Sequence, residues 1–75
     1  MVKVNVGNNL KRESVIVDST TTLRNVLKDA GIDYTRGTMH LDGCPLQPGD
    51  LDKTFESFGI QEECWLLNVV KADNA

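Results

Sequence analysis

Alternating valines at the start of the chain are the feature that most restricts its fold. Val2, Val4 and Val6 are separated by single polar residues, and this period of two predicts a strand with the valines on one face. The Gly7-Asn8-Asn9 segment that follows tolerates positive φ and suits a tight hairpin turn. A second strand is predicted over residues 10–18. Because a hairpin is not stable alone in water, another part of the chain must cover its apolar face.

A helix is predicted directly after this hairpin. Residues 19–22, Ser-Thr-Thr-Thr, offer hydroxyl groups that can accept a hydrogen bond from an unpaired backbone N–H at a helix start. Apolar side chains then recur at positions i, i+3, i+4 and i+7, namely Leu23, Val26, Leu27 and Ala30. Gly31 is placed to end the helix in the left-handed conformation. Such a short helix depends on tertiary packing, so we expect its apolar stripe to cover the hairpin.

The second half of the chain predicts further strands. Residues 38–42 alternate, with His40 on the face opposite to its two apolar neighbours, and Asp42-Gly43 is a strong turn signal. A brief fourth strand is expected around Leu46. Apolar residues after it predict a short helical turn or loop that closes one end of the core: Phe55, Phe58 and Ile60.

The last predicted strand, residues 64–71, carries apolar side chains on both faces. One register directs Trp65, Leu67 and Val69 to the core. The other register would bury an asparagine without an evident partner, which costs about 1–3 kcal/mol. We therefore expect the first register, in which the outer face carries Leu66, Asn68 and Val70.

Composition and charge exclude several classes of function. The chain has 75 residues, which is enough for one domain. Its 8 basic and 11 acidic residues give a net charge of −3, so it lacks the basic face that broad nucleic-acid binding requires. No apolar run approaches the ~20 residues of a membrane helix, and the N-terminus has no signal-peptide core. We expect a small acidic cytoplasmic protein that binds neither nucleic acid nor membrane.

Neither the cysteines nor the histidine predicts catalysis or metal binding. Cys44 and Cys64 are too few for a disulfide scaffold and lack the C-x-x-C spacing of a zinc site. We expect two free thiols and no disulfide, although a redox-dependent bridge would need only that their Cα atoms lie within ~7 Å. His40 has no nucleophile or metal-ligand set near it in the sequence. No enzymatic activity and no cofactor are expected.

Three segments resemble parts of ubiquitin, in the same order. Residues 22–26, Thr-Leu-Arg-Asn-Val, resemble the opening of its helix, and residues 58–64, Phe-Gly-Ile-Gln-Glu-Glu-Cys, resemble its entry into the last strand. Residues 41–46, Leu-Asp-Gly-Cys-Pro-Leu, are similar to the third-strand turn of ubiquitin-like proteins and of the thiamin and molybdopterin sulfur carriers. The resemblance implies an α+β fold for residues 1–72, a ubiquitin-like β-grasp. Its mixed four- to five-stranded sheet would have one helix packed on one face, and residues 73–75 would form a short C-terminal tail.

The chain departs from conjugated ubiquitins and sulfur carriers at their C-terminal motif. Those proteins are activated at a terminal Gly-Gly, whereas this sequence contains no Gly-Gly and ends in Lys-Ala-Asp-Asn-Ala. We therefore favour a non-conjugated protein-binding module that acts as a small adaptor or regulator. The alternative is a sulfur carrier or protein modifier that is activated through its C-terminus.

The open face of the sheet is the candidate site, because the resemblance implies that partners dock on the face that the helix leaves free. In the expected register its protein-binding residues are Ile16, His40, Leu66, Asn68 and Val70. Apolar groups framed by polar ones suit a small interface, although isolated exposed apolar residues are also normal on protein surfaces. The partner is expected to be a protein that the sequence does not identify, and the chain itself is expected to be monomeric or weakly self-associating.

Two polar features of the sequence each allow two interpretations. His40 could make binding sensitive to pH, or it could be an ordinary solvated side chain. The acidic residues of the second half could contact a basic partner or only solvate the surface; they are Asp50, Asp52, Glu56, Glu62 and Glu63.

Overall fold

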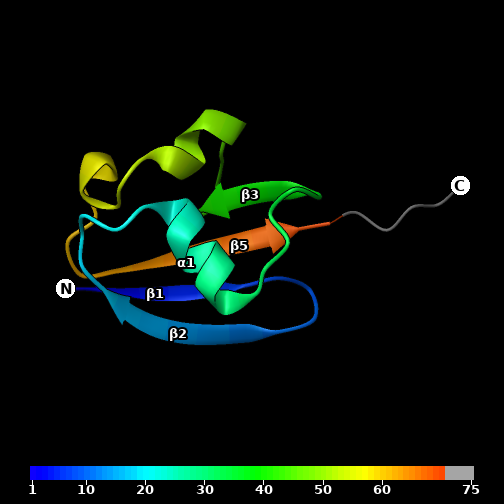
Figure 1. Cartoon of the computed structure of the whole chain (residues 1–75), viewed down its shortest axis with the longest axis horizontal. Coiled ribbons are helices and arrows are strands. Elements are labelled where there is room, and N and C mark those ends of the chain that lie inside the picture. The colour runs from blue at the N-terminus through cyan, green and yellow to red at the C-terminus, as the bar shows by residue number, and fades with distance from the viewer. Residues whose placement is uncertain (71–75) are drawn as a thin grey trace, which may run out of the picture.

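One mixed sheet and one helix form the core of the structure, a computed structural model that describes residues 1–70. Its elements, in chain order, are β1 (Val2–Gly7), β2 (Arg12–Val17), α1 (Leu23–Ala30), β3 (Thr38–Leu41), β4 (Cys44–Pro45), the 3-10 helices η1 (Pro48–Asp52) and η2 (Glu56–Phe58), and β5 (Glu63–Val69). The strand order is β2-β1-β5-β3-β4; β1 and β5 run parallel, and the other neighbours run antiparallel. Helix α1 lies across one face of the sheet (Figure 1). The predicted α+β β-grasp architecture is confirmed, and the predicted tail lies outside the described residues.

The β1–β2 hairpin forms as the valine alternation predicts. Val2, Val4 and Val6 are all buried on the side that α1 covers. The turn is held by the Asn8 side chain. Its Oδ1 accepts hydrogen bonds from the backbone N–H groups of Leu10 and Lys11, at 2.8 and 2.9 Å. Glycine is needed at position 7, because a Cβ atom there would lie 2.6 Å from the Lys11 carbonyl oxygen. The local sequence therefore determines both strands and the turn.

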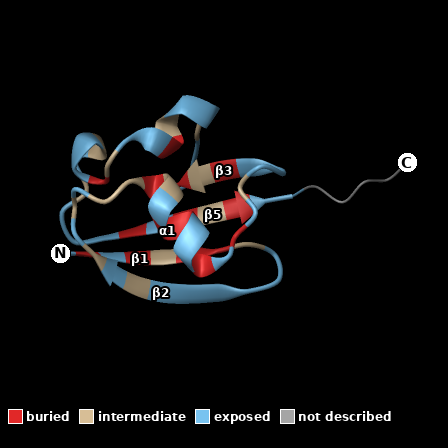
Figure 2. Ribbon diagram, viewed as in Figure 1, coloured by how far each residue is buried: buried red, intermediate tan, exposed pale blue. Residues whose placement is uncertain are grey.

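Helix α1 also begins and ends where its local signals predict. The Thr22 hydroxyl accepts a hydrogen bond from the Asn25 N–H at 3.2 Å, and Gly31 ends the helix with a φ of 73°. The predicted apolar stripe is buried against the sheet: Leu23, Val26, Leu27 and Ala30. Figure 2 shows that the buried residues gather along β1, β5 and the helix side that faces them, whereas β2 is largely exposed. The core therefore lies between α1 and the middle of the sheet.

The two 3-10 helices close one end of this core. Phe55, between them, is fully buried, and its N–H donates to the Thr21 carbonyl just before α1 at 3.4 Å. Leu51 is also buried, while Phe58 and Ile60 pack against the core from half-buried positions. The predicted closing segment is thus confirmed, with Phe55 as its central side chain.

The predicted register of β5 is wrong. Cys64 and Leu66 are fully buried and Asn68 is 2% exposed, whereas Trp65 and Val69 are 49% and 41% exposed. The cost that the sequence suggested for burying the asparagine is offset, because its Nδ2 donates to the Arg36 carbonyl oxygen at 2.8 Å and lies 3.1 Å from a buried methionine sulfur. That carbonyl is 32 residues away in the chain. A contact of this kind cannot be read from the pattern around β5 itself.

Candidate docking face

The sheet face opposite α1 carries an apolar stripe along β5, formed by Trp65, Leu67 and Val69. Successive side chains of a strand point to opposite faces, so these three project away from the helix while their neighbours are buried under it. The stripe lies in the middle of the sheet, since β5 has β1 on one side and β3 on the other. We call this surface the open face and these three residues the β5 stripe.

The structure places two of the predicted binding residues on the open face. Ile16 is 59% exposed at the β2 edge, where it pairs with Lys3, and the half-buried His40 lies opposite Leu67 of the stripe. Strands β2 and β3 are three spacings apart in the sheet, which is about 14 Å. Ile16 and His40 therefore flank the β5 stripe from opposite sides and do not contact each other.

The other three predicted residues do not lie on the open face. Leu66 and Asn68 are buried under α1, so their placement on an exposed surface is wrong and follows from the inverted β5 register. Val70 is 38% exposed, but it lies just beyond β5 beside the β1–β2 turn, where its carbonyl accepts a hydrogen bond from Asn9 Nδ2 at 3.1 Å. It lines a separate hollow together with Leu10 and the buried Asn68. The residues that sequence reasoning missed are those of the β5 stripe.

One signal in the sequence could have indicated the true register. The buried set includes the small Cys64, whose partner on β1 is the fully buried Val4, whereas the expected set would have required the much larger Trp65 on that face. Side-chain size at the start of β5 therefore carries information that the alternation of apolar residues does not.

Backbone and side-chain hydrogen bonds hold the start of the stripe in place. Asp42, in the β3–β4 turn with a φ of 51°, donates its N–H to the Trp65 carbonyl at 2.8 Å. Its Oδ1 also accepts from the Trp65 N–H at 2.9 Å. Asparagine and aspartate tolerate this left-handed conformation better than most residues. The turn thus fixes the backbone from which the indole projects.

Polar groups surround the stripe on the β1 side. Asn5 donates to Glu63 Oε2 at 2.8 Å and accepts from the Ser14 hydroxyl at 2.7 Å, and Lys3 lies 4.0 Å from the same glutamate oxygen. A hollow of about 200 Å³ opens here, and Asn5, Ser14, Arg12, Trp65 and Leu67 are among the residues that line it. An apolar centre with a hydrogen-bonded polar rim is the usual anatomy of a protein interface.

His40 leaves one buried nitrogen without a partner. Among the described residues, its Nδ1 has no hydrogen-bond partner. Buried polar atoms are nearly always paired, but this nitrogen is enclosed by the protein, so a molecule docked on the open face does not reach it. The neighbours that face it across the sheet are the uncharged Leu67 and Pro45.

The cysteines are chemically distinct. Cys44 is exposed and Cys64 is buried, and both are free in the structure. Burial, and then the nearby charges of Asp42 and Glu63, raises the pKa of the Cys64 thiol to about 12. Cys64 is therefore a neutral core side chain, and its thiolate is not available at physiological pH.

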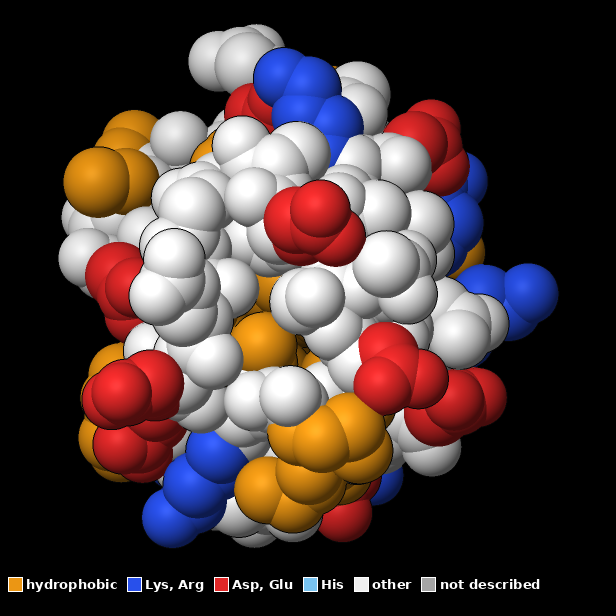
Figure 3. Space-filling view, turned by 90° about the vertical axis from the view of Figure 1, so that its left-hand side faces the viewer, with side chains coloured by type: hydrophobic (Ala, Val, Ile, Leu, Met, Phe, Trp, Pro, Cys, Tyr) orange, Lys and Arg blue, Asp and Glu red, His pale blue; other side chains and the backbone are white. Residues whose placement is uncertain are grey.

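At the end of the molecule that carries the N-terminus, acidic side chains do not gather into one patch but are spread among uncharged and hydrophobic groups (Figure 3). Three of the acids singled out in the sequence lie next to basic groups: Asp50 Oδ1 is 3.0 Å from Lys53 Nζ, Asp52 Oδ1 is 3.1 Å from Arg24 Nε, and Glu63 is the partner of Lys3 described above. Within residues 1–70, no group of three or more histidine, cysteine, aspartate or glutamate side chains could hold a metal ion. Over the same part of the chain, no helix has the length and apolar character needed to span a bilayer.

Comparison with known proteins gives a structural match and no sequence match. No family model matches the chain, and no curated protein matches it. A solution NMR structure of the ubiquitin-like domain of Arabidopsis thaliana protein At2g32350 is similar, with a TM-score of 0.70 and 20% sequence identity over 99% of this chain and 81% of that one. A second NMR structure of the same Arabidopsis protein gives a TM-score of 0.61 and 25% identity over 97% of this chain and 89% of that one. The chain therefore has the ubiquitin-like β-grasp fold.

Proposed function

We propose that the chain is a non-conjugated protein-binding module whose open face docks a protein partner, so that it acts as a small adaptor or regulator. The observation that carries this proposal is the β5 stripe: three neighbouring apolar side chains in the middle of a sheet face that no other element of residues 1–70 covers. The Arabidopsis likeness supports the fold alone, so the proposal depends on this surface.

The stripe has the composition of an interface centre. Tryptophan is among the residues that contribute most to binding energy at interfaces. A buried tryptophan covers 150–250 Å², and Trp65 is about half exposed. Covering the remaining ~100 Å² would contribute about 2.5 kcal/mol before the costs of association. Exposed Val69 and Ile16 would extend the buried apolar area on either side.

The sheet holds this surface in a fixed geometry. Leu67 pairs with His40 on β3, and Gly7 of β1 lies on its other side, so the stripe is supported by strands on both flanks. A preformed surface loses little conformational entropy on binding.

The test replaces exposed apolar area without changing the strand. Trp65→Thr combined with Val69→Thr places a β-branched side chain at both positions, which favours a strand, while it removes most of the stripe. Leu10→Thr is the matched control, since Leu10 is 93% exposed in the β1–β2 turn, away from the open face. Partners captured by the wild-type chain from the native host would be purified and titrated by calorimetry.

We expect a partner that binds the wild type and Leu10→Thr with equal Kd and binds the double variant at least about tenfold more weakly. Circular dichroism must show that the double variant is folded. Equal binding by the folded double variant, or a host that yields no partner that binds the purified wild-type chain, contradicts the proposal.

A further inference from the structure

A third hollow lies on the helix side of the sheet, away from the β5 stripe. It has a volume of about 370 Å³ and opens to solvent between α1, the segment that leads into β3, and η1. Its floor is apolar, because Met39 and Leu51 are buried and Leu46 packs partly against the core. The complete lining is Arg24, Tyr34, Thr35, Gly37, Thr38, Met39, Leu46, Gln47, Pro48 and Leu51.

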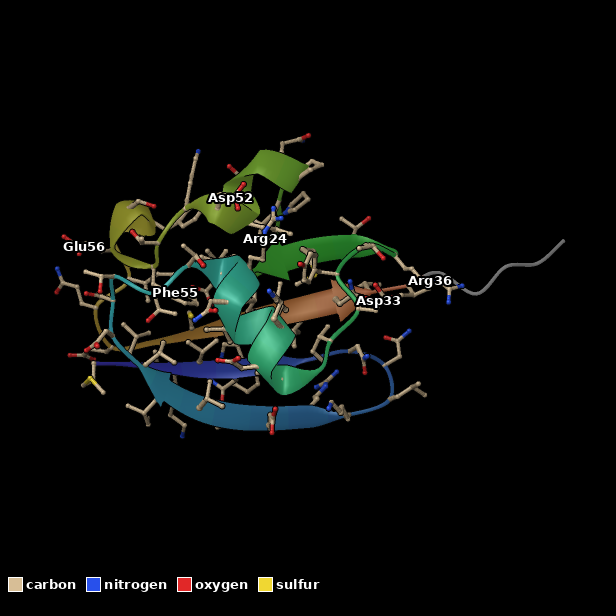
Figure 4. The ribbon with its side chains drawn as sticks, viewed as in Figure 1. Arg24, Asp33, Arg36, Asp52, Phe55 and Glu56 are labelled. Atoms are coloured by element: carbon tan, nitrogen blue, oxygen red, sulfur yellow. The ribbon has the colours of Figure 1, made fainter. Side chains whose placement is uncertain are left out.

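Arg24 stands in the wall of this hollow. Its guanidinium carbon lies 5.5 Å from the centroid of the Tyr34 ring, and its Nε lies 3.1 Å from Asp52 Oδ1. Figure 4 shows Arg24 and Asp52 together between α1 and η1. The Nε is buried, and within residues 1–70 it has no hydrogen bond of good geometry. The Asp52 side chain is 70% exposed, and an exposed ion pair of this kind contributes little stability.

The charge of the hollow differs from that of the whole chain. Among the described residues that line it, Arg24 carries the one full charge, whereas the chain as a whole has a net charge of −3. The planar guanidinium offers paired N–H donors that match a carboxylate. An occupant that complements this hollow therefore combines one carboxylate with an apolar group.

The shape of the hollow indicates how these two groups are joined. Its volume is near the lower limit of ligand pockets, which is about 300 Å³, and it is open to solvent, so it cannot enclose most of a free small molecule. A single terminal residue, with a side chain and a carboxylate on the same Cα atom, fits one hollow while the rest of its chain leaves through the open side.

We propose that this hollow binds the C-terminal residue of a partner polypeptide. The apolar side chain of that residue packs on Met39, Leu46 and Leu51, and its α-carboxylate pairs with Arg24. Asp52 is a competitor for the same guanidinium, so it weakens this binding. The site is separate from the β5 stripe, because Met39 faces the hollow while its neighbour His40 faces the open face.

Peptide titrations of the full, isotope-labelled chain followed by amide NMR test this proposal. The first probe is an acetylated hexapeptide of glycine and serine that ends in phenylalanine with a free carboxylate, and the second is the same peptide as a C-terminal amide. The third is a C-terminal amide with aspartate before the phenylalanine, which supplies an internal carboxylate. N-acetylphenylalanine is the fourth, and it represents a free small molecule.

We expect the free-acid peptide to shift the amide signals of Gly37, Thr38, Leu46 and Gln47, and both amide peptides to bind about tenfold more weakly. N-acetylphenylalanine should bind no more tightly than the free-acid peptide. Arg24→Gln should weaken binding of the free-acid peptide about tenfold, as expected for a lost charged hydrogen bond. Asp52→Asn should strengthen it.

Arg12→Gln is the matched control, since it makes the same change in net charge on the opposite side of the sheet and should leave the affinity unchanged. Arg24→Gln should weaken peptide binding and Asp52→Asn should strengthen it. Because a loss of stability would not strengthen binding, the second variant keeps the test valid even if the first is poorly folded. Four results overturn the proposal: equal binding of acid and amide peptides, tighter binding of N-acetylphenylalanine, unchanged affinity in folded Arg24→Gln, or no shifts at about 10 mM peptide.

Discussion

Replacement of Asn68 tests the hydrogen bond that compensates for its burial under α1. Its Nδ2 donates to the Arg36 carbonyl at 2.8 Å, and the residue is 2% exposed. Asn68→Ala removes the donor, so the Arg36 carbonyl loses this hydrogen bond, and it opens a small cavity where the amide group was. An unpaired buried acceptor costs about 1–3 kcal/mol; the bond to the Arg36 carbonyl is part-buried, so its share lies at the lower end of that range, and the lost packing adds to it. We expect a loss of about 2–3 kcal/mol in the free energy of unfolding.

This loss would be large for a chain of 75 residues. At 0.05–0.15 kcal/mol per residue, the total free energy of unfolding is about 4–11 kcal/mol. In a domain of this size each kcal/mol corresponds to roughly 4–8 °C in Tm, so Tm should fall by about 10–20 °C. Urea and thermal unfolding followed by far-UV circular dichroism measure both quantities.

Asn68→Leu separates the hydrogen bond from the packing. Leucine has the same number and branching of side-chain heavy atoms as asparagine and cannot donate, so it restores contacts but not the bond to Arg36. We expect it to lose about 1 kcal/mol less than Asn68→Ala and still to be less stable than the wild type. The reasoning is refuted if Asn68→Leu is more stable than the wild type, or if Asn68→Ala changes stability by less than about 0.5 kcal/mol.

Three further predictions concern the turn, the helix cap and the thiols. Asp42→Ala should cost about 1–2 kcal/mol, because it removes the acceptor for the Trp65 N–H and strains a left-handed residue, whereas Asp42→Asn should be nearly neutral in thermal unfolding; equal losses would contradict this. Thr22→Ala should cost about 1 kcal/mol in urea unfolding through loss of the helix cap, and Thr22→Ser should restore it. Iodoacetamide at pH 8 should modify Cys44 in the folded chain and Cys64 only in urea, because burial keeps the Cys64 thiol neutral below its pKa of about 12; mass spectrometry of both states would reveal early modification of Cys64.

Local patterns were sufficient for the hairpin and the helix. The valines of β1 alternate with polar residues, so one face is specified unambiguously. The α1 stripe, the Thr22 cap and the glycine at position 31 lie within one short segment and agree with one another. Agreement between propensity, periodicity and capping over a few residues is what makes a segment predictable from sequence.

The docking face depends on contacts that are distant in sequence, and its prediction was correspondingly incomplete. Ile16 and His40 lie on the open face, as the alternation of side-chain direction along a strand predicts for β2 and β3. On β5, each face carries a leucine, so a shift of one residue leaves the apolar pattern almost unchanged. The decisive contact is between Asn68 and the Arg36 carbonyl, and only the folded chain brings those groups together.

The exposure of Trp65 follows from packing of the core. If β5 slipped by one residue, the indole would replace the fully buried Cys64 beside Val4. Overfilling a packed core costs about 1–3 kcal/mol, and the slip would also remove the Asn68 donor from the Arg36 carbonyl and the Asp42 bonds from Trp65. The register that satisfies these groups places the indole, Leu67 and Val69 on the other side of the sheet. The same interactions that specify the core therefore create the apolar stripe that we propose as the docking surface.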